Sequence, residues 1–82
     1  MYHMLDERVM LPGGRRIEIS LAARGRYRLA CLAKGERLVE YFGDGSRHRR
    51  RVRGRESAYE FRSVEQLRYD FERDAEDAQR PG

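Results

Sequence analysis

The chain has 82 residues, the length of one small domain, and carries 18 basic against 14 acidic side chains for a net charge of +4. Its single cysteine excludes an internal disulfide and a cysteine-based zinc cluster, so the thin core expected at this size depends on close packing or on a partner chain. No apolar run approaches the roughly 20 residues that cross a bilayer, and residues 1–11 lack the basic-then-apolar order of a signal peptide. We expect a cytoplasmic protein without a membrane partner.

Charge is unevenly distributed along the chain. Residues 1–62 hold 15 bases and 8 acids, whereas residues 63–82 hold 3 bases and 6 acids. This asymmetry favours an anionic partner for the basic part, pairing between the two parts, or both. Of the basic residues, 17 are arginine and 1 is lysine, a bias typical of G+C-rich coding sequence, which points to a bacterium or to a phage or plasmid living in one.

The first two predicted strands flank a Pro12-Gly13 turn within residues 7–22. Proline presets φ for the second turn position, and glycine accepts the positive φ that follows. In the second strand every other residue is apolar: Ile17, Ile19 and Leu21. This period of two predicts a strand with one apolar face and one solvated face.

A turn at residues 23–25 leads to a third predicted strand over residues 26–33. Arg26 and Arg28 lie on one of its faces, and four residues share the other: Tyr27, Leu29, Cys31 and Ala33. The place of Cys31 in this apolar row indicates a small core residue rather than a nucleophile.

The middle of the chain predicts further short strands between turns. Residues 34–35 form a two-residue hairpin connection, and residues 37–42 have apolar side chains on both faces, which predicts a central strand. Turns at residues 43–46 and 54–57 surround an arginine-rich run, and residues 58–62 form a last strand. Two aromatic side chains of that strand are expected to face inward: Tyr59 and Phe61.

A helix is predicted over residues 63–78. Ser63 and Gln66 have the spacing of a capping box, which satisfies two backbone amides at the helix start. Apolar residues at spacings of three and four form one stripe: Val64, Leu67, Phe71, Ala75 and Ala78. Acids near the C-terminal end oppose the helix dipole, so we expect fraying beyond about Ala75.

These elements predict one α+β domain over residues 1–82: an antiparallel meander sheet of four to five strands with the C-terminal helix packed on one face. Residues 1–6 and 79–82 are expected to be loose. An unpaired edge strand next to "VEYF" (residues 39–42) would allow a homodimer by edge-to-edge pairing.

The run "RHRRRVRGR" (residues 47–55) contains 6 arginines, 1 histidine and no acid. As a strand it would carry Arg47, Arg49, Arg51 and Arg53 on one face, with His48, Arg50 and Val52 on the other. Rigid guanidinium forks suit phosphate oxygens. We therefore predict a nucleic-acid-binding site formed by nine residues: Arg47, His48, Arg49, Arg50, Arg51, Arg53, Arg55, Arg26 and Arg28.

Other interpretations of this run remain open. It is also consistent with a mobile charged loop, with a guarded edge strand, or with a segment neutralised by the helix or by Glu56 and Glu60. The run itself has no aromatic residue on which a base would stack. An acidic helix does not suit a DNA groove. The predicted function is thus non-catalytic contact with RNA or with the backbone of DNA.

The alternative is a different class of protein, an inhibitor or adaptor of phage or plasmid type that binds a host protein complex. Its contact would be the arginine face or the acidic helix, through three residues on one side of that helix: Glu65, Glu72 and Glu76. A ribonuclease is a third hypothesis, weakened because the arginines around His48 disfavour its charged form. No pattern indicates a cofactor, a phosphate-binding loop or a metal site.

Overall fold

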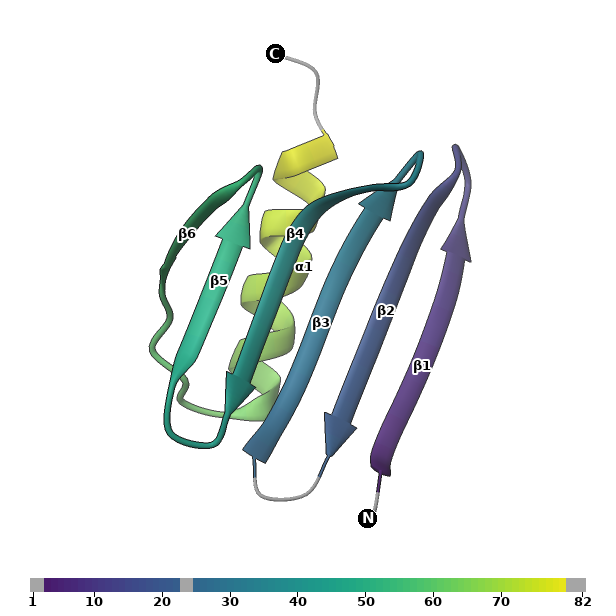
Figure 1. Cartoon of the computed structure of the whole chain (residues 1–82). Helices are drawn as coiled ribbons and strands as arrows, with labels where there is room; N and C mark the ends of the chain where they lie inside the picture. The colour runs from purple at the N-terminus through teal and green to yellow at the C-terminus, as the bar shows by residue number, and fades with distance from the viewer. Residues whose placement is uncertain (1–2, 23–24, 80–82) are drawn as a thin grey trace.

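The structure is a computed structural model that describes residues 3–22 and 25–79. It contains one antiparallel sheet of six strands in chain order, followed by a helix (Figure 1). The elements are β1 (His3–Leu11), β2 (Arg15–Ala22), β3 (Arg26–Ala33), β4 (Glu36–Asp44), β5 (His48–Val52), β6 (Arg55–Ala58) and α1 (Val64–Gln79). The predicted α+β class and meander order are confirmed, with six strands instead of four to five.

The extra strand comes from the arginine run and the residues after it. Residues 43–57, for which strand and loop were both open, contain the end of β4, a turn at residues 45–47 and most of the β5–β6 hairpin, which spans residues 48–58. Its turn is made by Arg53 and Gly54, whose φ angles of 49° and 83° lie in the left-handed region. The last strand was expected over residues 58–62, but β6 ends at Ala58, and the chain then leaves the sheet for the helix.

The strand next to "VEYF", which was expected to be an unpaired edge, is not at the edge of the sheet. β5 lies next to β4, as the position of "VEYF" suggested, but β6 pairs with β5 and covers it. The described sheet therefore has β1 and β6 as its edges. β1 already includes residues 3–6, although residues 1–6 were expected to be loose, and the pair Asp6–Ser20 joins this segment to β2. Of the segment 79–82, also expected to be loose, Gln79 belongs to α1. Residues 1–2 and 80–82 lie outside the described residues. Part of the turn expected at residues 23–25 lies outside the described residues.

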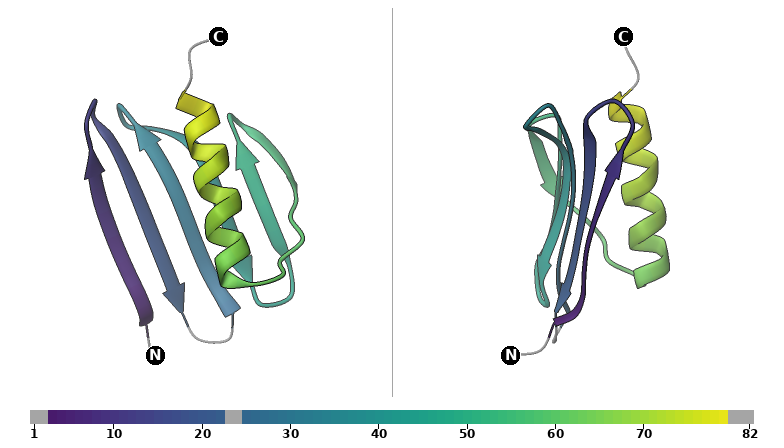
Figure 2. Two further views of the ribbon diagram at one scale, coloured as in Figure 1. Left: turned by 180° about the vertical axis from the view of Figure 1, so that it is seen from behind. Right: turned by 90° about the vertical axis from the view of Figure 1, so that its right-hand side faces the viewer.

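The helix packs over the β3–β5 part of the sheet and leaves β1 beside it uncovered (Figure 2). Ile19 of β2 still belongs to the buried core cluster that includes the helix residues. Four residues of the predicted stripe are buried in this contact: Leu67, Phe71, Ala75 and Ala78. The stripe prediction is wrong for Val64, which is 44% exposed because the first turn lies at the end of the sheet contact. Cys31 is buried in the core beside Leu29 and Val39, as predicted.

A side-chain hydrogen bond caps the start of α1, and the helix extends to Gln79. At the start, the Ser63 Oγ accepts a hydrogen bond from the backbone N–H of Gln66 at 3.1 Å, which is the first bond of the predicted capping box. The Gln66 side chain, which the box would turn back toward Ser63, donates to Asp70 instead. At the other end the helix is continuous to Gln79 instead of fraying beyond Ala75. Within the described part of the chain, no helix combines the length and the apolar character needed to span a membrane.

Candidate functional site

The strand registers sort the charged side chains onto two faces of the sheet. We call the face turned away from α1 the open face. Among the described residues, its arginines are Arg8, Arg16, Arg26, Arg28, Arg37, Arg49 and Arg51, and its acids are Asp6, Glu18, Glu40, Asp44 and Glu56. Seven positive charges against five negative ones leave this face with an excess of two.

Glu40 is the centre of the open face. Its side chain belongs to β4, and the residue is only 5% exposed. The Oε2 atom lies 2.5 Å from Arg28 Nη2 and 3.6 Å from Arg37 Nη1, and the Oε1 atom lies 3.4 Å from Arg51 Nη1. A buried carboxylate needs such partners. One carboxylate thus holds three guanidinium groups in place and neutralises one of their three charges.

Glu56 on β6 pairs with the two arginines that β5 directs to the open face. Its carboxylate lies 2.8 Å from Arg51 Nη2 and 3.1 Å from Arg49 Nε. The hydrogen bond from Arg51 is the main reason why the pKa of Glu56 is lowered. The side chains of Arg49 and Arg51 nevertheless remain 42% and 44% exposed. Their remaining N–H donors therefore face solvent.

Phe42 lies among these arginines. It is directly opposite Arg28 on β3 and Arg49 on β5. Two shallow depressions meet at its ring. The first, of about 330 Å³, is lined by Arg28, Arg37, Glu40, Phe42 and Arg51. The second, of about 540 Å³, is lined by Phe42, Gly43, Asp44, Arg47, Arg49 and Glu56. Phe42 was not among the predicted site residues, because it lies outside the arginine run and only an aromatic residue within that run was expected to stack on a base.

The structure does not bring the predicted arginine row together as expected. Arg49 and Arg51 share the open face, but Arg47 lies in the turn before β5. Arg53 lies in the turn after β5, where its left-handed backbone ends the alternation of the strand. The Arg53 guanidinium donates a hydrogen bond to the backbone carbonyl of Ala78 at the end of α1. The predicted row of four is therefore wrong, and β5 contributes two arginines to the open face.

Two other members of the run point toward the helix. Arg50 Nη1 lies 3.2 Å from Asp74 Oδ2 on α1 and 3.3 Å from the Tyr41 hydroxyl. Arg55 is opposite Val52 and so lies on this same side of the sheet. Across residues 3–22 and 25–79, neither Arg47 nor Arg55 has an acidic side chain within ion-pair distance.

His48 is part of an aromatic stack on the helix side. Its ring lies 5.6 Å from that of Tyr27 and 5.1 Å from that of Phe61, and its Nδ1 is 2.9 Å from the Tyr27 hydroxyl. Burial raises the pKa of Tyr27 to about 12. Gly43 makes room for the stack, because a Cβ there would lie 2.7 Å from both rings. His48 therefore does not join the arginines of the open face.

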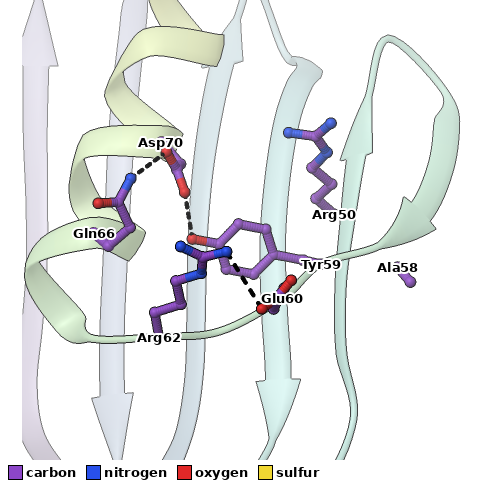
Figure 3. Close-up of a pocket in the computed structure, with 7 residues that line it drawn as sticks. All are labelled: Arg50, Ala58, Tyr59, Glu60, Arg62, Gln66 and Asp70. Atoms are coloured by element: carbon purple, nitrogen blue, oxygen red, sulfur yellow. Dashed lines mark hydrogen bonds and ion pairs between the residues drawn. The ribbon is translucent and has the colours of Figure 1, made fainter.

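A polar depression lies at the start of α1, and several of the side chains that line it bind one another (Figure 3). The Tyr59 hydroxyl donates to Asp70 at 2.7 Å, and Gln66 Nε2 donates to the same carboxylate at 2.9 Å. Burial raises the pKa of Tyr59 above its usual range, and the bond to Asp70 adds to this. Arg62 pairs with Glu60 at 3.4 Å. Tyr59 faces inward as predicted, whereas Phe61, which was expected to do the same, is 36% exposed. The contact of Tyr59 with Asp70 anchors the segment between β6 and α1.

The three acids of the alternative contact lie on the exposed side of the helix. Glu65, Glu72 and Glu76 are all exposed, and Tyr69 falls between them on the same side with 60% of its surface accessible. The guanidinium of Arg73 lies 5.8 Å from the centre of the Tyr69 ring. The molecule thus has a basic open face on the sheet and an acidic face on the helix.

Comparisons with known proteins do not add to this description. No protein-family model, no curated protein and no solved structure matches the chain. Among residues 3–22 and 25–79, no three His, Cys, Asp or Glu side chains are grouped so as to hold a metal ion. The case for a function therefore depends on the two charged faces.

Proposed function

We propose that this protein binds nucleic acid without catalysis, through phosphate contacts made by the open face. The observation that supports this best is the group of three guanidiniums, from Arg28, Arg37 and Arg51, held around the Glu40 carboxylate. Guanidinium forks that are already fixed in place lose less conformational entropy when they bind a phosphate. We place this activity in the cytoplasm, where a single thiol such as Cys31 stays reduced.

Internal pairing supports the proposal because it is incomplete. Two arginines of the run already contact the helix. Arg50 forms an ion pair with Asp74, and Arg53 donates a hydrogen bond to a backbone carbonyl. The acids that pair with Arg49 and Arg51 come from the sheet itself, and they are fewer than the arginines around them. A surface with an excess of positive charge attracts phosphate and releases counterions on binding.

The position of α1 argues against reading of duplex sequence. Its exposed side carries Glu65, Glu72 and Glu76, which a DNA groove would repel. Its opposite side is buried against the sheet. Contact through the sheet would instead use backbone phosphates, so binding is expected to vary little with base sequence and strongly with salt.

The test is a salt titration of binding to labelled RNA and DNA, measured by fluorescence anisotropy. The double variant R47Q/R49Q removes two charges from the depression beside Phe42, to which the open-face residue Arg49 and the turn residue Arg47 both contribute. Its matched control, R62Q/R68Q, removes two charges outside that face. We expect the first variant to reduce the slope of log K against log salt by about 2 and the control to leave it almost unchanged. Equal losses in the two variants, or no binding by the wild type, would overturn the proposal.

The exposed Tyr69 favours a second candidate, an adaptor or inhibitor that binds a basic surface of a host protein through the acidic side of α1. An exposed aromatic residue flanked by acids is a suitable centre for such an interface. Reversal of the three charges in E65K/E72K/E76K distinguishes the candidates. It should abolish binding to a protein partner, detected by pull-down from nuclease-treated lysate, and should preserve or strengthen binding to nucleic acid.

A further inference from the structure

We infer that the open face prefers single-stranded nucleic acid, with Phe42 as the surface on which an unpaired base stacks. This inference rests on the proposed function and specifies its ligand. The observation behind it is the register of the central strands, which places Phe42 between Arg28 and Arg49. An aromatic ring flanked by two guanidinium groups provides both parts of a single-strand site, a stacking surface and phosphate contacts.

The other aromatic residues of the molecule show how unusual this position is. In the described part of the chain, the rings on the helix side contact one another: Tyr27, Tyr41, Tyr59, Phe61 and Phe71. Tyr69 lies on the exposed side of α1. Phe42 is the one aromatic residue that the described sheet directs to the open face, and no described ring stacks on it. Its half-buried ring is thus open to a ligand.

Two depressions adjoin Phe42, and they could hold the nucleotides that precede and follow the stacked base. Arg28, Arg37 and Arg51 line the first depression, and Arg47 and Arg49 line the second. A base stacked on Phe42 would therefore have guanidinium groups near the phosphates on both of its sides. In a duplex the bases are stacked on each other and cannot reach a flat ring, so a duplex would use only the arginines.

The experiment compares ligands that share phosphate chemistry but differ in available bases. The probes are a labelled single strand of about 12 nucleotides, the same sequence as a duplex, and inorganic polyphosphate. In anisotropy titrations, we expect the wild type to bind the single strand more tightly than the duplex. The substitution Phe42→Leu keeps an apolar side chain but removes the ring. It should weaken single-strand binding roughly 5- to 100-fold and leave duplex and polyphosphate binding unchanged.

A spectroscopic readout tests stacking directly. The chain has no tryptophan, so Phe42→Trp introduces a single indole at the site, and Tyr69→Trp places one on the helix as a matched control. Single-stranded RNA should quench the fluorescence of the first variant and not that of the second. If Phe42→Leu binds all three probes as the wild type does, the stacking inference fails while the phosphate-binding proposal stands. If the wild type binds none of the probes, the proposed function itself fails.

Discussion

The Arg50 guanidinium lies 3.2 Å from the Asp74 carboxylate, and this contact joins β5 to α1. The buried Tyr41 hydroxyl also donates to Asp74. Burial first, and then this hydrogen bond, keep the pKa of Tyr41 above its usual range. Arg50 of the basic run is therefore used to attach the helix, whereas its neighbours Arg49 and Arg51 lie on the opposite face.

Loss of the Asp74 carboxylate should destabilise the fold. Asp74→Ala leaves the Arg50 guanidinium and the Tyr41 hydroxyl without their shared acceptor in a partly buried place. We expect the free energy of unfolding to fall by about 2 kcal/mol, measured by urea denaturation. Glu72→Ala on the exposed side of the same helix is the control and should change stability by less than about 0.5 kcal/mol. Equal midpoints for the two variants would contradict the role given to Asp74.

Arg53 should govern the stability of the last helical turn. Its guanidinium donates to the carbonyl of Ala78, where the helix dipole is negative and no basic residue of the helix itself is present in the last turn. Arg53→Gln should therefore speed amide hydrogen exchange in residues 75–79 by roughly 5-fold, the equivalent of about 1 kcal/mol. Arg55→Gln removes the same charge two residues further along and should not. If exchange in the Arg53 variant is unchanged, packing against the sheet alone stabilises this turn and Arg53 does not contribute.

The contact of Arg53 with the helix illustrates what sequence reasoning could not predict. The helix start was predictable because Ser63 and Gln66 are close in sequence and their spacing fixes the geometry. The contact at the helix end comes from Arg53, which is separated from Ala78 by the whole β6–α1 segment. Its left-handed φ of 49° is also uncommon for arginine, so the strand alternation appeared to continue through it.

The strands divide in the same way. β2 and β3 were predictable because alternating apolar residues such as Ile17 and Leu29 mark a buried face. β6 consists of Arg55–Ala58, all exposed, and offers no such pattern; only its pairing with β5 defines it. Phe42 was visible in the sequence, but its position between Arg28 and Arg49 depends on the registers of three strands. Register between strands separated by turns is set by the whole sheet.

Acid should weaken the turn between β4 and β5. Asp44 Oδ1 accepts hydrogen bonds from the backbone N–H groups of Arg47 at 2.9 Å and Ser46 at 3.0 Å. These bonds lower the pKa of Asp44 to about 2, against 3.8 in the unfolded chain. Between these two values the unfolded chain binds more protons than the folded one. The contribution of Asp44 to the free energy of unfolding is therefore fully present above about pH 5 and is lost as the pH decreases toward 2.

A second carboxylate acts in the same direction. Burial opposes ionisation of Asp70, but the hydrogen bonds from Tyr59 and Gln66 outweigh it, and the pKa of Asp70 is lowered. Melting temperatures measured from pH 6 to 2 should fall less steeply for Asp44→Asn than for the wild type, because asparagine still accepts hydrogen bonds but does not titrate. The control Asp77→Asn, exposed on α1, should follow the wild-type curve. Parallel curves for all three proteins would show that Asp44 does not contribute to acid sensitivity.

Glu40 should have opposite effects on stability and on binding. Its buried carboxylate offsets the repulsion among Arg28, Arg37 and Arg51, and under the proposed function it would compete with phosphate for the same donors. Glu40→Gln removes this charge while keeping the size of the side chain. We expect the free energy of unfolding to fall by about 2 kcal/mol. The loss is limited to this size because the arginine partners are half exposed and solvent screens part of the interaction.

The same substitution frees one positive charge on the open face, and we expect this gain to outweigh the loosening of the guanidinium groups that the carboxylate holds. Nucleic-acid binding at low salt should therefore strengthen, and the salt dependence should steepen by about one phosphate contact. Glu65→Gln on α1 changes the net charge equally but lies away from the open face, so it separates a local effect from a general one. Stability by urea denaturation and affinity by anisotropy should thus move in opposite directions for Glu40→Gln alone. A weaker affinity would mean that Glu40 is needed to hold the guanidinium groups in their binding geometry, and that the carboxylate and the phosphate do not compete.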